Sequence, residues 1–389
     1  MAATDLLGEI KVLDLSSVGP ASRASRVLAD YGADVIKVAP TRKKGAAQIR
    51  PPFHTYGAGR GMRRMRIDLK APAGIDALLK LAASADVVIE SYRPGVADRL
   101  GIGYAAMSVA NPRIVYCSTS GYGQDGPYAQ WAGHDINYLA LSGFLACSEP
   151  RADGGPPIPG ATVADSAGGG MHAVLAILAA LVKRSVSGKG AYLDVAATDG
   201  MLSLMSLSID QYLATGEVAG PRQTLLTGKY AFYDVYEAKD GKWLSVGAIE
   251  PHFYASLCKR LGLDRYIEHQ MNDEKQDEIR AAFRARFKER DRDQWVAELA
   301  PNDTCVAPVY TIPEIVEDEH LTARGAFMRA EHPEHGPFRQ VAPILAGGVR
   351  NQPTHRVPDP DQTETDEILK TAGLTANEIE HLISTGVVE

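Results

Sequence analysis

KVLDLSSVGPASRASRVLADYGADVIKVAP, residues Lys11 to Pro40, decides the fold of this chain. A short apolar run from Lys11 is followed by apolar residues at helical spacing that end at Gly32, and a second apolar run starts at Asp34. This pattern predicts a strand, a helix and a second strand, which together form a βαβ unit. The turn after the first strand lacks the GxGxxG pattern of dinucleotide-binding folds, so a nicotinamide-dependent enzyme is disfavoured.

The same alternation continues along the next part of the chain. Residues 72–85 have helical periodicity, whereas residues 86–91 and 113–123 are typical of buried strands. Strands that alternate with helices form parallel sheets, so the first half is predicted to be doubly wound α/β.

The remaining sequence predicts a second, smaller domain. Residues 230–249 are typical of a hairpin that turns at Asp240 and Gly241, and amphipathic helices follow it. We therefore expect three parts: a large α/β domain over residues 1–200 and 340–389, a linker helix and loop over 201–228, and a small α+β domain over 229–335.

The totals disfavour several classes of protein. The 389 residues are 45% apolar and 23% charged, as in soluble globular proteins, and a net charge of −7 disfavours nonspecific binding to nucleic acid. The N-terminus has no signal-peptide pattern and the apolar run at 171–182 is judged too short to span a bilayer, so a cytoplasmic protein without membrane insertion is expected. The four cysteines form no CxxC pair, which argues against a metal site and against disulfides.

His134 precedes an apolar stretch at helical spacing and is predicted to lie in the first turn of a helix. The positive end of a helix disfavours protonation of the ring, which would keep a neutral imidazole available as a base. On the residues alone, a capping or packing histidine is the simpler interpretation.

Two carboxylates also lie at predicted helix starts. Asp165 is a good N-cap before a long apolar helix, and Glu250 precedes Pro251, a favourable first helical residue. Capping explains each of them in isolation. Gly168 to Gly170 are costly in a helix, however, and favour close approach of a ligand to the backbone. Helix starts that met in the fold would suit an enolate or oxyanion.

Basic residues cluster near the second and third predicted strands. Such a run is usually a solvated face, but arginine forks also bind phosphates well. The residues concerned are Lys37, Arg60, Arg63, Arg64, Arg66, Arg93 and Arg99.

Taken together, the motifs resemble the superfamily of family III CoA-transferases and α-methylacyl-CoA racemases, also known as the CaiB/BaiF superfamily. The resemblance covers essentially the whole chain and rests on five segments: ADYGADVIKV (29–38), ESYRPGVADRLGIGY (90–104), TSGYGQDGPYAQWAGHDINYLALSG (119–143), DSAGGGMHAVLAILAAL (165–181) and TDEILKTAGLTANEIEHLISTGVV (365–388). Within it, GHDINY (133–138) and GAIEPHFY (247–254) are similar to the racemase branch.

The resemblance implies a 2-methylacyl-CoA racemase that moves the α-proton between the two faces of the thioester through a planar enolate. His134 would be the base on one face with Glu250 as its orienting partner, and Asp165 would serve the opposite face. No metal or redox cofactor is implied, because CoA enters as part of the substrate.

The resemblance also implies the remaining site and the assembly. A Rossmann-like large domain would include both chain ends, and two ring-shaped chains would interlock as a homodimer. The acyl-CoA site would be formed by Lys37, Ile67, Ser91, Arg99, Gly133, His134 and Tyr138, with Arg64 near the CoA phosphates.

The chain departs from the family pattern at three places. Lys37 replaces the arginine usual in racemases and would stack less well on adenine. Lys229 and Tyr230 replace a glycine and a small residue, and would narrow or redirect the acyl pocket. The segment over residues 41–60 is longer than the branch pattern.

Two alternatives to a racemase remain open. A CoA-transferase would use Asp165 as a covalent nucleophile and would require an acceptor acid, which a racemase ignores. A non-catalytic acyl-CoA-binding protein would use the three titratable residues only as helix caps. The acyl group itself is open, since apolar pockets discriminate weakly among branched, sterol and aryl-propionyl chains.

Overall fold

The computed structural model describes residues 6–389 except 17–18, 43–51, 344–345, 348–351 and 360–361. The chain forms two compact units. Unit 1 takes the chain up to residue 142, residues 159–205 and the chain from residue 320 onward, and unit 2 takes residues 143–158 and 206–319.

Unit 1 is built on a six-stranded parallel sheet, as the alternation of strands and helices predicts. Its strand order, β3-β2-β1-β4-β5-β6, is that of doubly wound dinucleotide-binding folds. The strands are β1 (Lys11–Asp14), β2 (Asp34–Ala39), β3 (Arg63–Arg66), β4 (Val87–Glu90), β5 (Val115–Ser120) and β6 (Ala191–Ala196).

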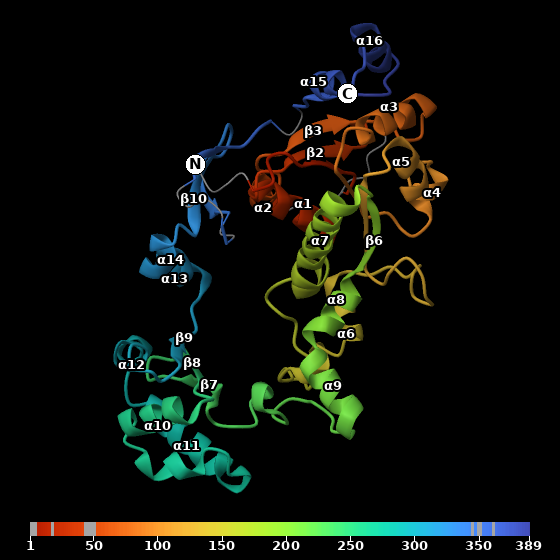
Figure 1. The fold of residues 1–389 in the computed structure, drawn as a ribbon. Coiled ribbons are helices and arrows are strands. Elements are labelled where there is room, and N and C mark those ends of the chain that lie inside the picture. Colours follow the sequence, from red (N-terminus) through yellow and green to blue (C-terminus); the bar gives the residue numbers. More distant parts are fainter. Residues whose placement is uncertain (1–5, 17–18, 43–51, 344–345, 348–351, 360–361) are drawn as a thin grey trace. The chain divides into compact units, whose positions relative to one another are not determined.

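Successive strand residues point to opposite sides of the sheet, so its buried strands present apolar side chains on both faces. Helices cover both faces. Val12 and Val87 pack with the first helix layer, whereas the adjacent Leu13 and Val88 pack in the core beneath the second. The helices of both layers are labelled in Figure 1. The first layer consists of α1 (Pro20–Asp30) and α7 (His172–Ser187); the second contains α3 (Pro72–Ala82), α5 (Tyr104–Ala110), α15 (Thr365–Thr371) and α16 (Ala376–Ser384).

The C-terminal part of the chain returns to unit 1, as the resemblance implies. Ile67 forms a β-bridge with Val388, and α15 packs near β3. A second sheet in this unit contains β10 (Phe327–His332), β11 (Gly336–Val341) and β12 (His355–Arg356). The predicted small domain extended to residue 335, whereas the structure assigns β10 to unit 1, where it pairs with both β11 and β12.

Unit 2 has its own apolar core under a three-stranded sheet. The predicted hairpin is present, with β7 and β8 antiparallel and Gly241 at a positive φ of 77°. Residues 206–215, predicted as part of a linker, form a helix that belongs to this unit. The elements are α9 (Ser206–Thr215), β7 (Tyr233–Glu237), β8 (Trp243–Gly247), α10 (Pro251–Arg260), α11 (Gln276–Phe287), α12 (Arg292–Leu299), β9 (Val306–Pro308) and α13 (Ile312–Glu317).

The long apolar helix of unit 1 corrects one sequence prediction. A π-helical segment, η3 (Ala164–Met171), continues into α7, and the 24 residues are long and apolar enough to cross a membrane by length and composition alone. The argument that this run is too short was therefore wrong. One side of the helix nevertheless lies in the core of unit 1, where Val174 and Ile177 are buried, which is typical of a core helix.

The glycines of η3 are explained by packing of the chain on itself. A Cβ at residue 169 would lie 2.5 Å from the Cβ of Pro20 in α1. A Cβ at Gly200, in α8 (Ala197–Leu204), would lie 1.8 Å from the Gly168 carbonyl oxygen. The glycines thus let η3 approach α1 and α8, so the close approach that we expected from a ligand comes from neighbouring helices.

We expect Gly200→Ala to destabilise unit 1 by at least about 2 kcal/mol, because the new methyl group must displace backbone atoms of η3. Thermal unfolding followed by circular dichroism should show a lower melting temperature. Gly160→Ala is the matched control, since a Cβ there meets nothing within 4 Å. Equal melting temperatures for the two variants would contradict the packing argument.

Candidate active site

His134 lies at the start of α6 (Asp135–Leu141), one residue before the first helical turn that the sequence predicts for it. It is the N-cap residue with an extended backbone, and its N–H donates to Asn137 Oδ1 at 2.9 Å. The Asn137 side chain therefore holds the backbone of the N-cap residue at this helix start. His134 is exposed.

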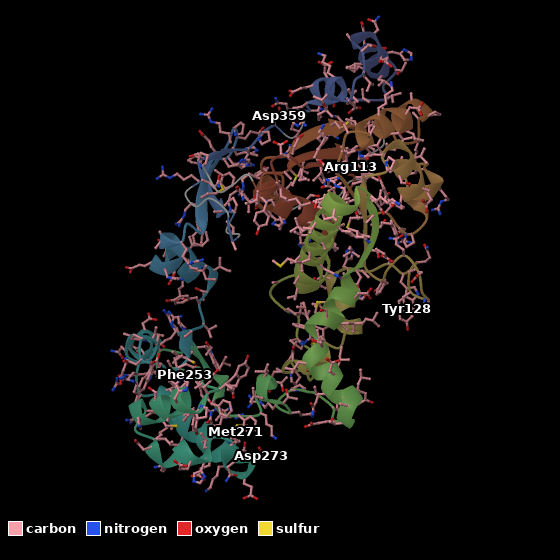
Figure 2. All side chains as sticks on the ribbon, viewed as in Figure 1. Arg113, Tyr128, Phe253, Met271, Asp273 and Asp359 are labelled. Carbon is pink, nitrogen blue, oxygen red and sulfur yellow. The ribbon has the colours of Figure 1, made fainter. Side chains whose placement is uncertain are left out.

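Gly133 and Tyr138 fix the loop that leads into His134. The Tyr138 hydroxyl donates to the Gly133 carbonyl oxygen at 2.7 Å, and a Cβ at Gly133 would lie 2.7 Å from the hydroxyl of Tyr122. Burial, with a smaller contribution from Asp165, raises the pKa of Tyr138 to about 12, so this hydroxyl remains a donor. Tyr128, labelled in Figure 2, lies earlier in the same loop and contacts Trp131 with a ring separation of 4.0 Å.

Asp165 is the second residue of η3 and its side chain does not cap the helix as predicted. Its carboxylate instead pairs with Arg23 of α1, with Arg23 Nη1 3.3 Å from Asp165 Oδ2. Its backbone N–H donates to Asp135 Oδ1 at 2.8 Å, which ties η3 to the start of α6.

His134 and Asp165 are brought together in unit 1. Burial raises the pKa of Asp165, Arg23 opposes that rise, Asp135 adds to it, and His134 is near enough to lower it. A carboxylate and an imidazole at neighbouring helix starts have the chemistry to take and return a proton on a bound molecule.

Sequence reasoning missed Arg23. It holds the residues on both sides of Asp165, with Nε 3.0 Å from Ser166 Oγ and Nη2 2.8 Å from Thr162 Oγ1. One sequence feature could have identified Arg23 as a site residue. It lies near the start of the first helix after β1, at the carboxyl edge of a parallel sheet, where ligand sites of such folds lie.

Glu250 is an exposed N-cap residue of α10, before Pro251 at the first helical position. The predicted helix start is present, but the carboxylate makes no capping hydrogen bond. Its charge contributes, after burial, to the raised pKa of Cys305. Glu250 belongs to unit 2, whereas His134 and Asp165 belong to unit 1, so only the latter two meet within one unit.

Lys37 of β2 is occupied by the chain itself. Its Nζ lies 2.7 Å from Oδ2 of the fully buried Asp14 and 3.1 Å from Ser16 Oγ. The lysine charge therefore compensates a buried carboxylate. Ser91 follows β4 and is half-buried, and Arg99 is exposed at the end of α4 (Val96–Arg99).

The arginine run at residues 60–66 also has partners of its own. Arg60 pairs with Asp30 at 3.2 Å and Arg63 pairs with Asp34. Burial lowers the pKa of Arg64, and its backbone N–H donates to Glu364 Oε2 at 2.8 Å. Arg60 and Arg63 therefore have ion-pair partners within the fold, and Ile67, the next predicted site residue, is buried.

Two of the places where the sequence departs from the family pattern, Lys229–Tyr230 and the segment 41–60, have contacts within their own units. In unit 2, Lys229 Nζ lies 2.8 Å from Asp273, which Figure 2 labels, and the buried Tyr230 stacks on Phe232. Of the long segment, residues 43–51 lie outside the described residues, and α2 (Pro52–Ala58) packs Phe53 against Phe338 of β11.

A separate polar cavity of about 170 Å³ lies at the carboxyl ends of β4 and β5. It is lined by the buried Glu90, whose pKa is raised by desolvation, together with Ser118 and Tyr192. His134 and Asp165 are not among its lining residues. Within the described part of the chain, no group of three or more His, Cys, Asp or Glu residues could hold a metal ion.

Comparisons with known proteins agree with this architecture. The alpha-methylacyl-CoA racemase of Homo sapiens is 36% identical over 383 residues, which cover 98% of this chain and 97% of that protein. The succinyl-CoA:glutarate CoA-transferase of Homo sapiens is 29% identical and covers 98% of this chain and 89% of its own length. The crystal structure of a CAIB/BAIF family protein from Brucella suis superimposes with a TM-score of 0.70 at 27% identity and covers 93% of each chain.

The model of CoA-transferase family III matches residues 7–364, which include four of the five segments that carried the resemblance; the segment 365–388 lies beyond the match. Its match covers both units, and the named relatives align along nearly the whole chain. The chain therefore belongs to CoA-transferase family III.

Proposed function

We propose that this protein is a 2-methylacyl-CoA racemase, which interconverts the (R) and (S) thioesters by 1,1-proton transfer. The observation that carries the proposal is that the Asp165 N–H donates to Asp135, the residue after His134, so that His134 and Asp165 lie at joined helix starts of unit 1. The 36% identity to the human protein named alpha-methylacyl-CoA racemase supports the same reaction.

The proposed reaction breaks the C–H bond at the α-carbon on one face and forms it on the other. His134 or Asp165 takes the proton, the electron pair moves onto the thioester oxygen as an enolate, and the opposite group returns a proton. This requires two groups of comparable basicity. Burial raises the pKa of Asp165 above its usual value, which makes this carboxylate a stronger proton acceptor than an exposed one.

Glu250 of unit 2 is proposed as the group that orients the His134 ring. The reaction needs no metal or redox cofactor, and CoA is part of the substrate. We propose that the acyl-CoA site is formed by Lys37, Ile67, Ser91, Arg99, Gly133, Tyr138 and Arg64.

A second candidate, CoA transfer, is favoured by the 29% identity to the human succinyl-CoA:glutarate CoA-transferase. In that reaction the Asp165 carboxylate attacks the thioester carbonyl and expels CoA as a thiolate, forming a mixed anhydride. The thiolate then attacks the Asp165 carbonyl and releases the first acid, which leaves a CoA thioester on Asp165 for an acceptor carboxylate. It requires an acceptor acid and leaves an adduct detectable by mass spectrometry.

We further propose a cytoplasmic homodimer. The side of α7 that faces away from the core carries the exposed apolar residues Leu175, Val182 and Val186, which a second copy would cover. The interlocking of ring-shaped chains implied by the family resemblance supports such a cover.

The reaction is tested by proton NMR of one enantiomer of a 2-methylacyl-CoA in deuterium oxide, with EDTA and without an acceptor acid. The α-proton signal should disappear while the other enantiomer forms. His134→Ala should slow exchange by about 100-fold or more from the enantiomer that His134 deprotonates, because a general base is lost, and should leave CoA binding nearly intact.

His320→Ala, at an exposed histidine of unit 1, is the control and should exchange both enantiomers normally. Equal exchange of the two enantiomers by His134→Ala would reject the role of His134. Exchange that requires an acceptor acid would favour CoA transfer. Asp165→Asn should abolish either reaction and therefore does not separate them.

The assembly is tested by sedimentation equilibrium. We expect a mass twice the 41.8 kDa of the chain, and Leu175→Glu should shift the protein toward monomer because it places a charge on the apolar side of α7. Val109→Glu, at a residue of α5 that is 85% exposed, is the matched control. A monomeric parent protein would contradict the dimer, and an unchanged dimer in Leu175→Glu would remove α7 from the interface.

A further inference from the structure

Arg23 is the side chain that fixes the Asp165 carboxylate in place. Its Nη1 contacts Asp165 Oδ2 at 3.3 Å, its Nε contacts Ser166 Oγ at 3.0 Å and its Nη2 contacts Thr162 Oγ1 at 2.8 Å. All three nitrogens of one planar guanidinium are thus directed at η3 and at the turn before it. A planar group held at three points has little freedom to rotate away from the carboxylate.

The arrangement is built into the packing of α1 against η3. A Cβ at residue 170 would lie 3.0 Å from the Cβ of Arg23, so the glycine there lets the stem of Arg23 lie directly against η3. The side chains of Arg23 and Asp165 are 29% and 17% exposed, so this ion pair is only partly solvated and is screened less than a surface pair.

Other groups also face Asp165. Asp135 and His134 lie at the start of α6; Asp135 raises the pKa of Asp165 and His134 lowers it. The charge of Asp165 in turn raises the pKa of Tyr138 in α6. From α8, Ala197 and Met201 pack against η3 and bring no charge. Arg23 is therefore the cation that α1 contributes, and its charge opposes the rise in the Asp165 pKa that burial and Asp135 cause.

We propose that Arg23 is a positioning residue for proton transfer at Asp165: the guanidinium pins Oδ2 and thereby presents Oδ1 to the α-carbon of the substrate. This inference rests on the proposed racemase function. The positive charge of Arg23 also favours the ionised carboxylate, which is the form able to accept a proton.

The positive charge of Arg23 predicts the direction in which the pH profile of activity moves when Arg23 is replaced. The active pair holds one proton shared between His134 and Asp165, so activity falls at low pH when Asp165 is protonated beside a protonated His134. Removing Arg23 makes Asp165 easier to protonate, which moves this acid limb to higher pH. The limb should move alike for both enantiomers, because their equilibrium fixes the ratio of the two kcat/KM values.

The test compares pH profiles of kcat/KM for racemisation by the parent protein, Arg23→Gln, Arg23→Lys and Arg26→Gln. In Arg23→Gln we expect the acid limb to move up by about one pH unit or more. Arg23→Lys keeps the charge but cannot reach three partners, so its limb should stay near that of the parent while kcat falls. Arg26, which pairs with Asp30 on the same helix, is the control and should leave both limbs in place.

An acid limb of Arg23→Gln that coincides with the parent limb would overturn the proposal, whatever its rate. If Arg23→Gln does not fold, the double variant Thr162→Val, Ser166→Ala releases the guanidinium from two partners; an unchanged kcat there would also overturn it.

A second readout does not depend on activity. Protonated carboxyl groups react with a water-soluble carbodiimide, and peptide mass spectrometry follows the pH at which Asp165 becomes labelled. Labelling of Asp165 should extend to higher pH in Arg23→Gln than in the parent protein. A parent protein that labels in this way but exchanges no α-proton would reject the racemase and still decide whether Arg23 controls the charge of Asp165.

Discussion

Between α1 and α8 the backbone of η3 approaches both helices so closely that Gly168, Gly169 and Gly200 leave no room for a Cβ. This contact determines where the residues at the start of η3 can lie. With α1 held against η3, Arg23 reaches the Asp165 carboxylate, and the hydrogen bond from the Asp165 N–H to Asp135 fastens the start of α6, and with it His134, to the same place. The glycines lower the local stability of the helix, and the close packing that they allow fixes the positions of Asp165, His134 and Arg23.

Much of the fold could be predicted because it follows local periodicity. The alternation of apolar strands and amphipathic helices around Lys11 to Pro40 indicates parallel strands, and a strand flanked by helices on both faces must be apolar on both sides, as Val12 and Leu13 are. The helix starts at Asp135 and Pro251 were visible for the same reason. The boundary near β10 was not, because its partners, β11 and β12, are set by pairing rather than by periodicity.

The site was only partly predictable because its charges are paired over long sequence distances. Arg23 and Asp165 are separated by 142 residues, and no spacing rule connects a residue of α1 with one of η3. Likewise Lys37 looks like a phosphate ligand in the sequence, but in the fold it lies against the buried Asp14. Burying an unpaired carboxylate is costly, so this pairing is a requirement of the fold before it is a feature of a ligand site.

The two candidate reactions make different demands on the same carboxylate. A covalent nucleophile works best fully ionised, which favours a low pKa, whereas a group that must accept a proton and return it needs a pKa near that of its partner. Arg23 favours the first condition, but burial is the larger effect and the pKa of Asp165 is raised overall. A carboxyl group that is oriented by a cation and has a raised pKa would suit the proposed reversible proton transfer, in which His134 would be the second group.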